Sequence, residues 1–439
     1  MLKLALPVVA AELGWVAMSL VDTIMVGRVS AVAIGAVSIG GMLFYTLATF
    51  TAGLMLGLDT LVSQSYGAGD IRDCHRSLLN AVYLCLPLPP VIMLAVWWVG
   101  PGLAAFGIDG EVSRQANEYL RAVAWGSLPL LLYFAFRRYL QAMNLVKPVM
   151  FALISANVVH LLANWIFIYG NWGAPPLGAR GAGWATCFSR VYMAGCLIGY
   201  TVWHARRHRT GWGEISLRPD WPRMRRLLKL GLPAGFQISL EVGVFAAATA
   251  LVGRLSPVTL ATHQIALNCA TITYMVPLGI GSAAAVRIGQ AVGRNDGEGA
   301  RFAGWTAILL GAAFMTVMGA AFVLVPRGIL HIFTDNVSVI DAGVMLLFVA
   351  AVFQLFDGIQ TVSTGALRGL GDTHTPMLCN LVGYWFVGLP VGYWLCFKQG
   401  QGAPGLWIGL CFSLILIGAT LLTVWSRKSR CLVIAAAIH

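Results

Sequence analysis

Long apolar runs separated by short polar breaks dominate the chain of 439 residues. A helix of about 20 apolar residues crosses a hydrocarbon core of about 30 Å, and about twelve runs reach that length. The pattern therefore predicts an all-α integral membrane protein with twelve transmembrane helices. We expect them near residues 3–28, 33–66, 77–100, 117–143, 148–169, 181–204, 227–253, 258–290, 300–326, 338–368, 375–397 and 404–426.

Composition supports a membrane environment. Hydrophobic residues make up 58% of the chain and charged residues only 10%, against about 25% in soluble domains. The first apolar run begins just after Met1 and contains Glu12 and Asp22, so we expect it to stay in place and not to be cleaved as a secretory signal. The nine cysteines form no CxxC pair and no zinc-like group with histidine, which predicts small core residues.

The net charge of +12 comes from Lys and Arg in the loops between apolar runs and not from a basic domain. This pattern indicates membrane orientation, and we expect no nucleic acid partner. Positive loops stay inside, so the longest one is predicted to be cytoplasmic, and an even number of spans then places both termini inside. Its basic residues are Arg206, Arg207, Arg209, Arg218, Arg223, Arg225, Arg226 and Lys229.

The chain repeats itself with a shift of 226 residues. Lys3-Leu-Ala-Leu-Pro7 aligns with Lys229-Leu-Gly-Leu-Pro233, and Gln64, Gly67 and Asp70 align with Gln290, Gly293 and Asp296. We predict an N-terminal six-helix lobe at 1–204, a basic linker at 205–226, a C-terminal six-helix lobe at 227–426 and a cytoplasmic tail at 427–439, frayed or lying on the membrane. Parallel halves of this kind usually rock about a site between them.

Five carboxylates fall inside the predicted spans: Glu12, Asp22, Asp59, Glu241 and Asp357. A charge at the bilayer centre costs at least about 2.5 kcal/mol, so an ion or proton pathway is the default interpretation. Glu12 and Asp59 also fit a position near a helix end, where a carboxylate contacts water or caps a neighbour. A carboxyl group in a cavity can hold a proton, or bind sodium when ionised, and either cation would compete with an organic cation.

Tyr274 lies in the middle of the eighth span, where its ring is either a contact for an organic cation or a packed core residue. His263, Gln264 and Asn268 precede it at helical spacing. His263 and Asn268 are typical of polar contacts between membrane helices, with direct ligation as the alternative.

Four motifs resemble the multidrug and toxic compound extrusion (MATE) family, particularly its NorM branch, over essentially the whole chain. They are Val21-Asp-Thr-Ile-Met-Val-Gly27, Thr262-His-Gln-Ile-Ala-Leu-Asn268, Phe353-Gln-Leu-Phe-Asp357 and Ala366-Leu-Arg-Gly-Leu-Gly-Asp-Thr373. The resemblance implies the MATE fold, with two pseudo-symmetric lobes around a V-shaped central cavity. It also implies a secondary active antiporter that exports organic cations such as drugs and dyes in exchange for inward sodium or protons. We accordingly expect a monomer among the lipids of the bacterial inner membrane, without enzymatic activity, a structural metal or any cofactor beyond the coupling ion.

The resemblance also implies roles for particular residues. By this resemblance, Asp22, Glu241 and Asp357 couple transport to a cation, and sodium can bind transiently at Glu241 and Asp357. The resemblance likewise implies that the substrate binds to Tyr274, Gln264 and Asp357. A candidate N-lobe cation site comprises Asp22, His160 and Asn164.

Two positions depart from the NorM pattern. His160 stands where relatives often carry Asn, and Asp59 in Gly57-Leu-Asp-Thr-Leu-Val-Ser-Gln64 is more similar to eukaryotic-type members, which are commonly linked to protons. The choice between sodium and protons stays open at the level of sequence.

Three other functions fit the sequence less well. A flippase for lipid-linked intermediates, the runner-up, needs several arginines in its cavity, and only Arg137, Arg138 and Arg190 lie well inside spans. An intramembrane enzyme would need a reactive set such as HExxH or GxS, and ATP-driven transport a Walker A sequence; none occurs in the chain. A passive channel seldom needs a two-lobe repeat with buried carboxylates.

Overall fold

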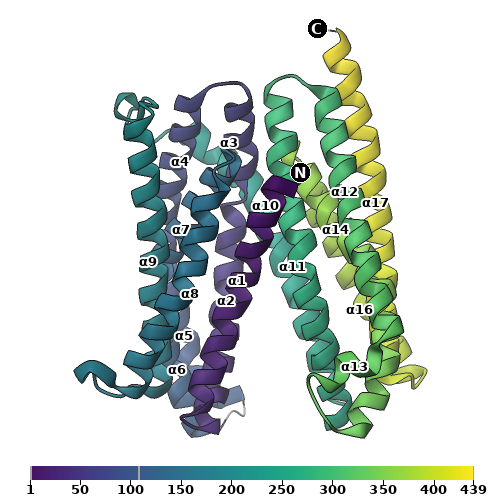
Figure 1. Ribbon diagram of the computed structural model, residues 1–439. Helices are drawn as coiled ribbons and strands as arrows, with labels where there is room; N and C mark the ends of the chain where they lie inside the picture. Colours follow the sequence, from purple (N-terminus) through teal and green to yellow (C-terminus); the bar gives the residue numbers. More distant parts are fainter. Residues whose placement is uncertain (1, 107–108, 439) are drawn as a thin grey trace. The chain divides into compact units, whose positions relative to one another are not determined.

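The protein is described by a computed structural model that covers residues 2–106 and 109–438. The described residues form helices and contain no β-strand, which confirms the predicted all-α fold (Figure 1). The helices belong to two compact units. The first unit is Ala10–Gly235, and the second comprises Phe236–His439 together with Met1–Val9, in so far as these residues are described.

Most of the first unit consists of helices of 11 to 30 residues, and α1 and α10 each contribute to both units. Its α-helices are α1 (Leu2–Gly27), α2 (Ala31–Leu54), α3 (Gly57–Gly67), α4 (Ile71–Cys85), α5 (Leu88–Val99), α6 (Gly110–Ala124), α7 (Ser127–Ala142), α8 (Val146–Tyr169), α9 (Gly178–Arg207) and the start of α10 (Trp221–Val252). Short 3₁₀ helices lie at Gly100–Phe106, Asn171–Gly173 and Trp212–Glu214.

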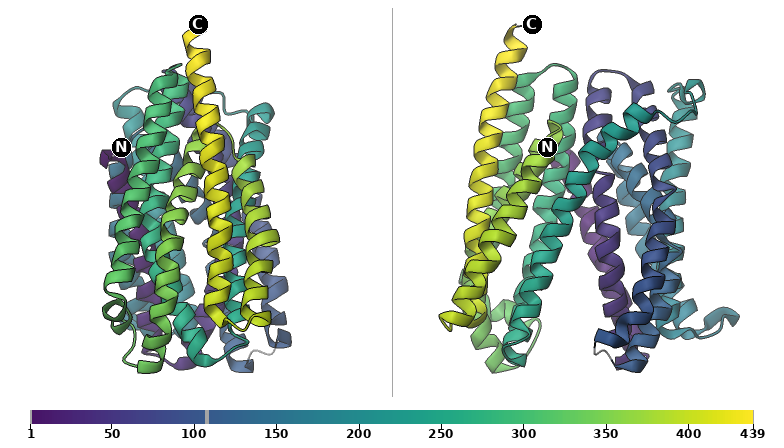
Figure 2. Two further views of the ribbon diagram at one scale, coloured as in Figure 1. Left: turned by 90° about the vertical axis from the view of Figure 1, so that its right-hand side faces the viewer. Right: turned by 180° about the vertical axis from the view of Figure 1, so that it is seen from behind.

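The second unit continues with long helices and adds two π-helical stretches. Its α-helices after α10 are α11 (Pro257–Gly293), α12 (Gly297–Leu324), α13 (Pro326–His331), α14 (Val337–Gly369), α15 (His374–Asn380), α16 (Leu389–Tyr393) and α17 (Gly402–Ile438). The π-helices at Leu381–Gly388 and Trp394–Lys398 join α15, α16 and the turn before α17 into one run. Figure 2 shows this run beside α17 in both of its views.

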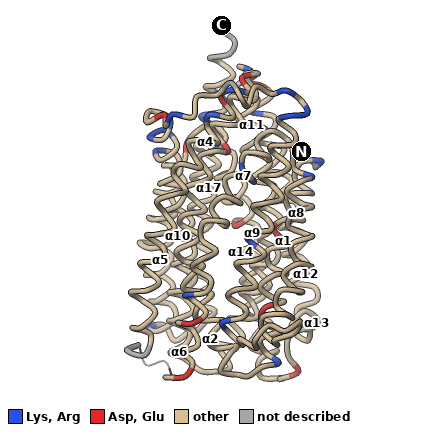
Figure 3. Tube along the Cα trace, turned by 90° about the vertical axis from the view of Figure 1, so that its left-hand side faces the viewer, with Lys and Arg blue, Asp and Glu red and all other residues tan. Residues whose placement is uncertain are grey.

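Within the described residues, ten helical runs are long and apolar enough to cross a membrane, and the bent pair α6–α7 makes eleven. The sixth predicted span, 181–204, corresponds to α9, which is long enough but more polar than the others. Charged residues gather near the ends of the helices, while the middle of most helices is uncharged (Figure 3).

Several predicted spans are interrupted. The second predicted span divides into α2 and α3, and the third into α4 and α5 at Pro87, which has no N–H to donate to the helix. The fourth bends by 50° between α6 and α7. The last span was expected to end near residue 426, but α17 continues to Ile438 through the residues expected to form a tail.

The sequence repeat produces the same helix caps in both units. Ser30 caps α2 by accepting a hydrogen bond from the N–H of Ala33. Ser256, 226 positions later, caps α11 by accepting a hydrogen bond from the N–H of Thr259. Asp70 caps α4 with φ −88° and ψ 82°, and Asp296 caps α12 with φ −92° and ψ 83°. Each cap satisfies an N–H that the first helical turn leaves unpaired, so the repeated residues start equivalent helices at equivalent points.

Small residues bring α11 and α14 together in the second unit. A Cβ added to Gly365 would overlap the carbonyl oxygen of Gly281, and one added to Gly369 would lie 2.7 Å from that of Ala285. Membrane helices gain stability mainly from van der Waals packing, because lipid tails are as apolar as their side chains. These glycines therefore allow the close contact that stabilises the pair.

In the first unit two buried carboxylates pair with arginines. Glu12 on α1 forms an ion pair with Arg137 on α7, and both side chains are nearly inaccessible. Asp59 on α3 lies 3.4 Å from the guanidinium of Arg138, the next residue on α7. Each pair neutralises charges whose individual burial would cost several kcal/mol (about 3–5 if one partner is removed).

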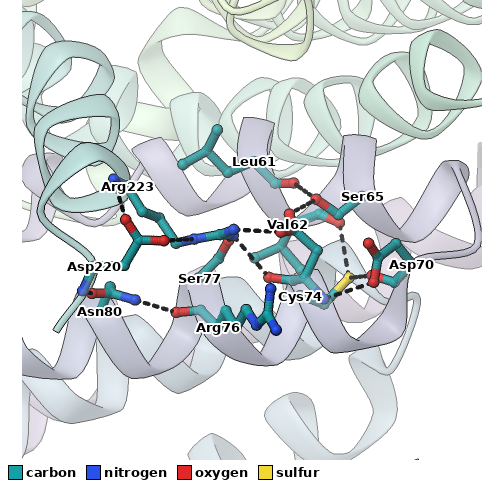
Figure 4. A network of polar contacts seen from close by, with 11 residues as sticks. Leu61, Val62, Ser65, Asp70, Cys74, Arg76, Ser77, Asn80, Asp220 and Arg223 are labelled. Carbon is teal, nitrogen blue, oxygen red and sulfur yellow. Dashed lines mark hydrogen bonds and ion pairs between the residues drawn. The ribbon is translucent and has the colours of Figure 1, made fainter. Parts of the chain in front are cut away.

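The basic linker packs against α4 through polar contacts (Figure 4). Arg223 pairs with Asp73 and Asp220 and donates 2.9 Å to the hydroxyl of Ser77. The side-chain oxygen of Asn80 accepts from the N–H of Asp220 at 2.8 Å. The linker is therefore an ordered part of the first unit.

We predict that Gly365→Ala destabilises the second unit, since its methyl group would overlap backbone atoms that cannot rotate away. Overpacking of this kind costs about 1–3 kcal/mol. Thermal unfolding in detergent should show a lowered midpoint. The matched control is Gly199→Ala on α9, where a Cβ meets nothing within 4 Å and the midpoint should hold or rise.

We predict a second stability effect at the Glu12–Arg137 pair. Glu12→Gln alone leaves a buried guanidinium without its counter-charge and should cost about 3–5 kcal/mol, whereas Glu12→Gln combined with Arg137→Met should recover most of that loss. The same thermal measurement applies. If the single variant were as stable as the unaltered protein, the pair would not stabilise the first unit.

Candidate functional site

Asp22 sits in a compact polar cluster in the first unit. Its Oδ1 lies 2.7 Å from Nε2 of His160 and accepts a 2.6 Å hydrogen bond from Nδ2 of Asn164. His160 and Asn164 stand one turn apart on α8, so both reach the same carboxylate on α1. On its other side, Nδ1 of His160 is 2.9 Å from the hydroxyl of Ser189 on α9.

The cluster is closed on most sides. His160 is 1% exposed and Asn164 and Ser189 are 0% exposed, whereas the side chain of Asp22 keeps 14% of its surface accessible. Arg190, the neighbour of Ser189, stacks over Phe44 at 4.5 Å and donates to the carbonyl of Val123 at 3.3 Å. Asp22 is thus the one member through which this buried network is open to solvent.

Glu241 is the centre of a second cluster, built entirely from the second unit. It lies on α10 and accepts hydrogen bonds from Tyr274 on α11, Gln360 on α14 and Gln237 on its own helix. Asn380 at the end of α15 approaches it at 3.4 Å. Its hydrogen-bond donors are neutral, and among the described residues no arginine or lysine forms an ion pair with it.

Asp357 belongs to the same cluster. It lies on α14, is 4% exposed and interacts electrostatically with Glu241. Tyr384, which is fully buried, interacts with both carboxylates. Two acidic groups that share a buried site cannot both carry a charge without a cation or a proton between them.

The backbone beside this cluster is irregular. Asn380 ends α15, and the π-helix that contains Tyr384 starts at the next residue. π-helical segments occur frequently at functional sites, because the wider turn displaces a side chain from its regular position. Here Asn380, just before the irregular segment, contacts Glu241, and Tyr384 within it interacts with the same carboxylate electrostatically.

The structure divides the other predicted residues of α11 between two environments. His263 is fully buried and bonded to Thr249 at 2.9 Å and to Trp407 at 3.0 Å, which agrees with a polar contact between helices. Gln264 and Asn268 are exposed. Among the described residues, no hydrogen bond joins Gln264 to the Glu241 cluster, whereas Tyr274 does bond to it.

Sequence reasoning found the acidic members of both clusters and overlooked most of the neutral ones. Ser189, Gln237, Gln360, Asn380 and Tyr384 were not singled out. Their signal was present, because each is a hydrogen-bonding side chain inside an apolar span, and such groups need partners in a membrane.

The three arginines considered for a phosphate-lined cavity already have partners. Arg137 pairs with Glu12, Arg138 with Asp59, and Arg190 with Val123 and Phe44. Of the five carboxylates inside the predicted spans, Glu12 and Asp59 form ion pairs with arginine in the described part of the chain, whereas Glu241, Asp357 and Asp22 do not. Chemically, the two clusters are suited to holding a proton or a small cation.

Comparison with known proteins places the chain in a family. The family model described as MatE matches residues 7–166 and again residues 233–394. The two matches begin 226 positions apart, which is the shift found in the sequence repeat. Two copies of one family unit therefore account for most of the chain.

Curated and solved relatives agree with that match. The "Probable multidrug resistance protein NorM" of Mesorhizobium japonicum is 36% identical over 98% of this chain and 93% of its own length. The crystal structure of the eukaryotic MATE transporter AtDTX14 has a TM-score of 0.85 at 20% identity and covers 99% of this chain and 98% of its own. A MOP superfamily transporter from Pyrococcus furiosus, described as having a binding pocket of reversed polarity, has a TM-score of 0.88 at 18% identity. The match covers 98% of this chain and 95% of that one. The chain is a multi-pass membrane protein that belongs to the MatE family of transporters, with NorM proteins among its relatives.

Proposed function

We propose that this protein is a secondary active multidrug antiporter, which exports organic cations in exchange for inward sodium or protons. The observation that carries the proposal is the Glu241–Asp357 cluster. Two carboxyl groups share a membrane-embedded site with neutral donors and an aromatic ring, and no arginine of the described residues forms an ion pair with them. Such a site attracts cations and releases one cation when another binds.

Exchange follows from competition. An organic cation and a coupling cation compete for this pair of carboxyl groups, because both need the same carboxylate oxygens and the same negative charge in a medium of low dielectric constant. Binding of the coupling ion from outside therefore displaces the drug, and the transporter returns to the inside with that ion bound and releases it there. In transporters built from two parallel repeats, rocking of the lobes exchanges access between the two sides of the membrane.

The charge of the site distinguishes the export of organic cations from the flipping of lipid-linked intermediates. A solved protein of the same fold is described as having reversed pocket polarity and a different function, so the fold alone leaves the charge of the substrate open. Here the arginines inside the spans already form ion pairs or polar and ring contacts. Among the described residues, the carboxylates Glu241 and Asp357 of the second unit form no ion pair with a basic residue. We infer cationic substrates such as drugs and dyes, which the relatives' names as multidrug resistance proteins support.

We further propose that the protein lies in the bacterial inner membrane with both termini in the cytoplasm. The support is the linker with its excess of Arg, since positively charged loops stay on the cytoplasmic side.

We predict that Asp357→Asn abolishes ethidium efflux from liposomes that hold the purified protein under an imposed sodium or proton gradient. The amide carries no negative charge and takes up no proton, so the coupling cation would be held too weakly to displace the drug. The matched control is Asp341→Asn on the same helix, an exposed carboxylate paired with Arg327, which should leave efflux unchanged. Equal efflux by the Asp357 and Asp341 variants would remove Asp357 from the coupling machinery.

We predict that Tyr274→Leu weakens ethidium binding. The ring lies beside Glu241, and loss of a cation–π contact worth about 0.5–2 kcal/mol should raise Kd about 2- to 30-fold. Fluorescence titration of the purified protein measures the change. Tyr274→Phe, which keeps the ring and removes the hydroxyl, should retain most of the affinity. A Kd unchanged by Tyr274→Leu would assign the ring to packing alone.

A further inference from the structure

A groove lies between α11 and α12 of the second unit, beside the turn that joins these helices. Its volume is about 350 Å³. Ligand pockets in proteins commonly measure about 300–1,000 Å³, so this groove has room for a small polar group. Arg287 and Arg294 line it from the end of α11, and Gly299, Phe302 and Ala303 line it from the first turns of α12.

The internal repeat identifies the equivalent surface of the first unit. Helices α4 and α12 begin 226 positions apart, and with this shift Gly299 corresponds to Asp73. Ala303 corresponds to Ser77. In the first unit the linker occupies this surface, because Arg223 pairs with Asp73 and donates 2.9 Å to the hydroxyl of Ser77 (Figure 4). A cationic side chain of the chain itself therefore fills the equivalent surface there.

The groove of the second unit has the opposite charge. Gly299 stands in place of the carboxylate that binds Arg223 in the first unit. Arg287 stands where the first unit has Leu61, and Arg294 adds a second positive charge. A cation would be repelled from this groove, and an anion would be attracted to it.

The two arginines of the groove are available to a ligand. Both are exposed, and among the described residues neither side chain forms an ion pair or a hydrogen bond. The nearest acids in the sequence are Asp296 and Glu298. Asp296 caps α12 by accepting from the N–H of Gly299 at 2.7 Å, and Glu298 does not line the groove. Guanidinium groups without a carboxylate partner are suited to binding phosphate oxygens.

An apolar face continues from the groove along α12. Phe302, Leu309 and Val317 recur at intervals of seven and eight residues, and all three side chains are exposed. Residues at these intervals lie on one side of a helix. In a helix that spans a membrane, such an exposed apolar side is in contact with acyl chains. The groove and this face together match an amphiphile with an anionic headgroup better than a free phosphate ion.

The groove lies at the end of the second unit where α17 ends. A Cβ added to Gly297, the first residue of α12, would lie 2.7 Å from the carbonyl oxygen of Leu432 on α17. In the topology proposed above, this end faces the cytoplasm. The cytoplasmic leaflet carries anionic lipids, and basic pockets between spanning helices on this side bind their headgroups.

We propose that the groove at Arg287 and Arg294 binds the phosphate headgroup of an anionic phospholipid from the cytoplasmic leaflet, with an acyl chain along Phe302 and Leu309. The lipid fills in the second unit the surface that Arg223 fills in the first, with the charges of site and occupant exchanged. No residue of the Glu241 cluster lines the groove, so binding here does not require the proposed antiport function.

Native mass spectrometry of the purified protein in detergent tests the proposal by counting bound lipids. Phosphatidylglycerol and phosphatidylcholine with identical acyl chains are titrated separately, and we expect the first phosphatidylglycerol to bind more tightly than phosphatidylcholine. Arg287→Gln combined with Arg294→Gln should raise the Kd of that phosphatidylglycerol about 10- to 30-fold, because each arginine near a membrane surface contributes a factor of about five. The Kd of phosphatidylcholine should change much less.

The matched control is Arg254→Gln combined with Arg301→Gln. These two exposed arginines of the same unit do not line the groove, so this variant loses the same charge and should keep the preference for phosphatidylglycerol. Thermal unfolding in detergent without added lipid should give the same midpoint for both double variants and the unaltered protein, which separates a lost site from a lost fold.

A soluble competitor separates a lipid from a free phosphate. Glycerol 3-phosphate has the phosphate but no acyl chain, and at equal concentration it should leave bound phosphatidylglycerol in place. Displacement at equal concentration would assign the groove to soluble phosphates and overturn the lipid proposal. Phosphatidylglycerol bound equally well by the groove variant, or weakened equally in the control variant, would contradict the site itself. These results concern the lipid site alone, and the efflux measurements decide the antiport function separately.

Discussion

The high free energy of a charge or an unpaired polar group in hydrocarbon is the constraint on which this structure depends. It explains why the described residues are helical, since helices satisfy their backbone hydrogen bonds internally. It also explains the fate of the buried carboxylates. Glu12 and Asp59 each pair with an arginine, whereas Glu241 accepts hydrogen bonds from neutral donors and shares its site with Asp357. A carboxylate–arginine pair is electrically neutral by itself. The Glu241–Asp357 site, in the proposed function, is neutralised by a bound cation.

Asp22 represents a third solution to the same constraint. Its partner is a histidine, whose Nε2 lies 2.7 Å from the carboxylate oxygen. The carboxylates inside the spans therefore have three kinds of partner: arginine for Glu12 and Asp59, neutral amides and a phenol for Glu241, and a histidine with an asparagine for Asp22. The two units descend from one repeated sequence, with Ser30 and Ser256 capping equivalent helices, yet their carboxylates have different partners.

Much of the fold could be predicted, because the lengths of the apolar runs and the internal repeat can be read from the sequence. The breaks within the predicted spans were harder to predict. Trp125 and Gly126 lie between α6 and α7, but the composition of this apolar run does not reveal the bend there. The acidic site residues stood out as charges inside spans. Asn380 and Gln360 did not, because neutral polar residues are common in membrane helices and their convergence on Glu241 depends on helix packing. Pairing of Glu12 with Arg137 likewise joins residues 125 positions apart, which no local pattern indicates.

The central claim is that organic and coupling cations compete for membrane carboxylates, and equilibrium binding tests it without any gradient. Ethidium affinity of the purified protein would be measured by titration over a range of pH and sodium concentrations, for the unaltered protein and for Glu241→Gln combined with Asp357→Asn. The account predicts that raising the concentration of the coupling cation weakens ethidium binding in the unaltered protein and has little effect on the double variant. Ethidium binding that is independent of both pH and sodium in the unaltered protein would contradict it.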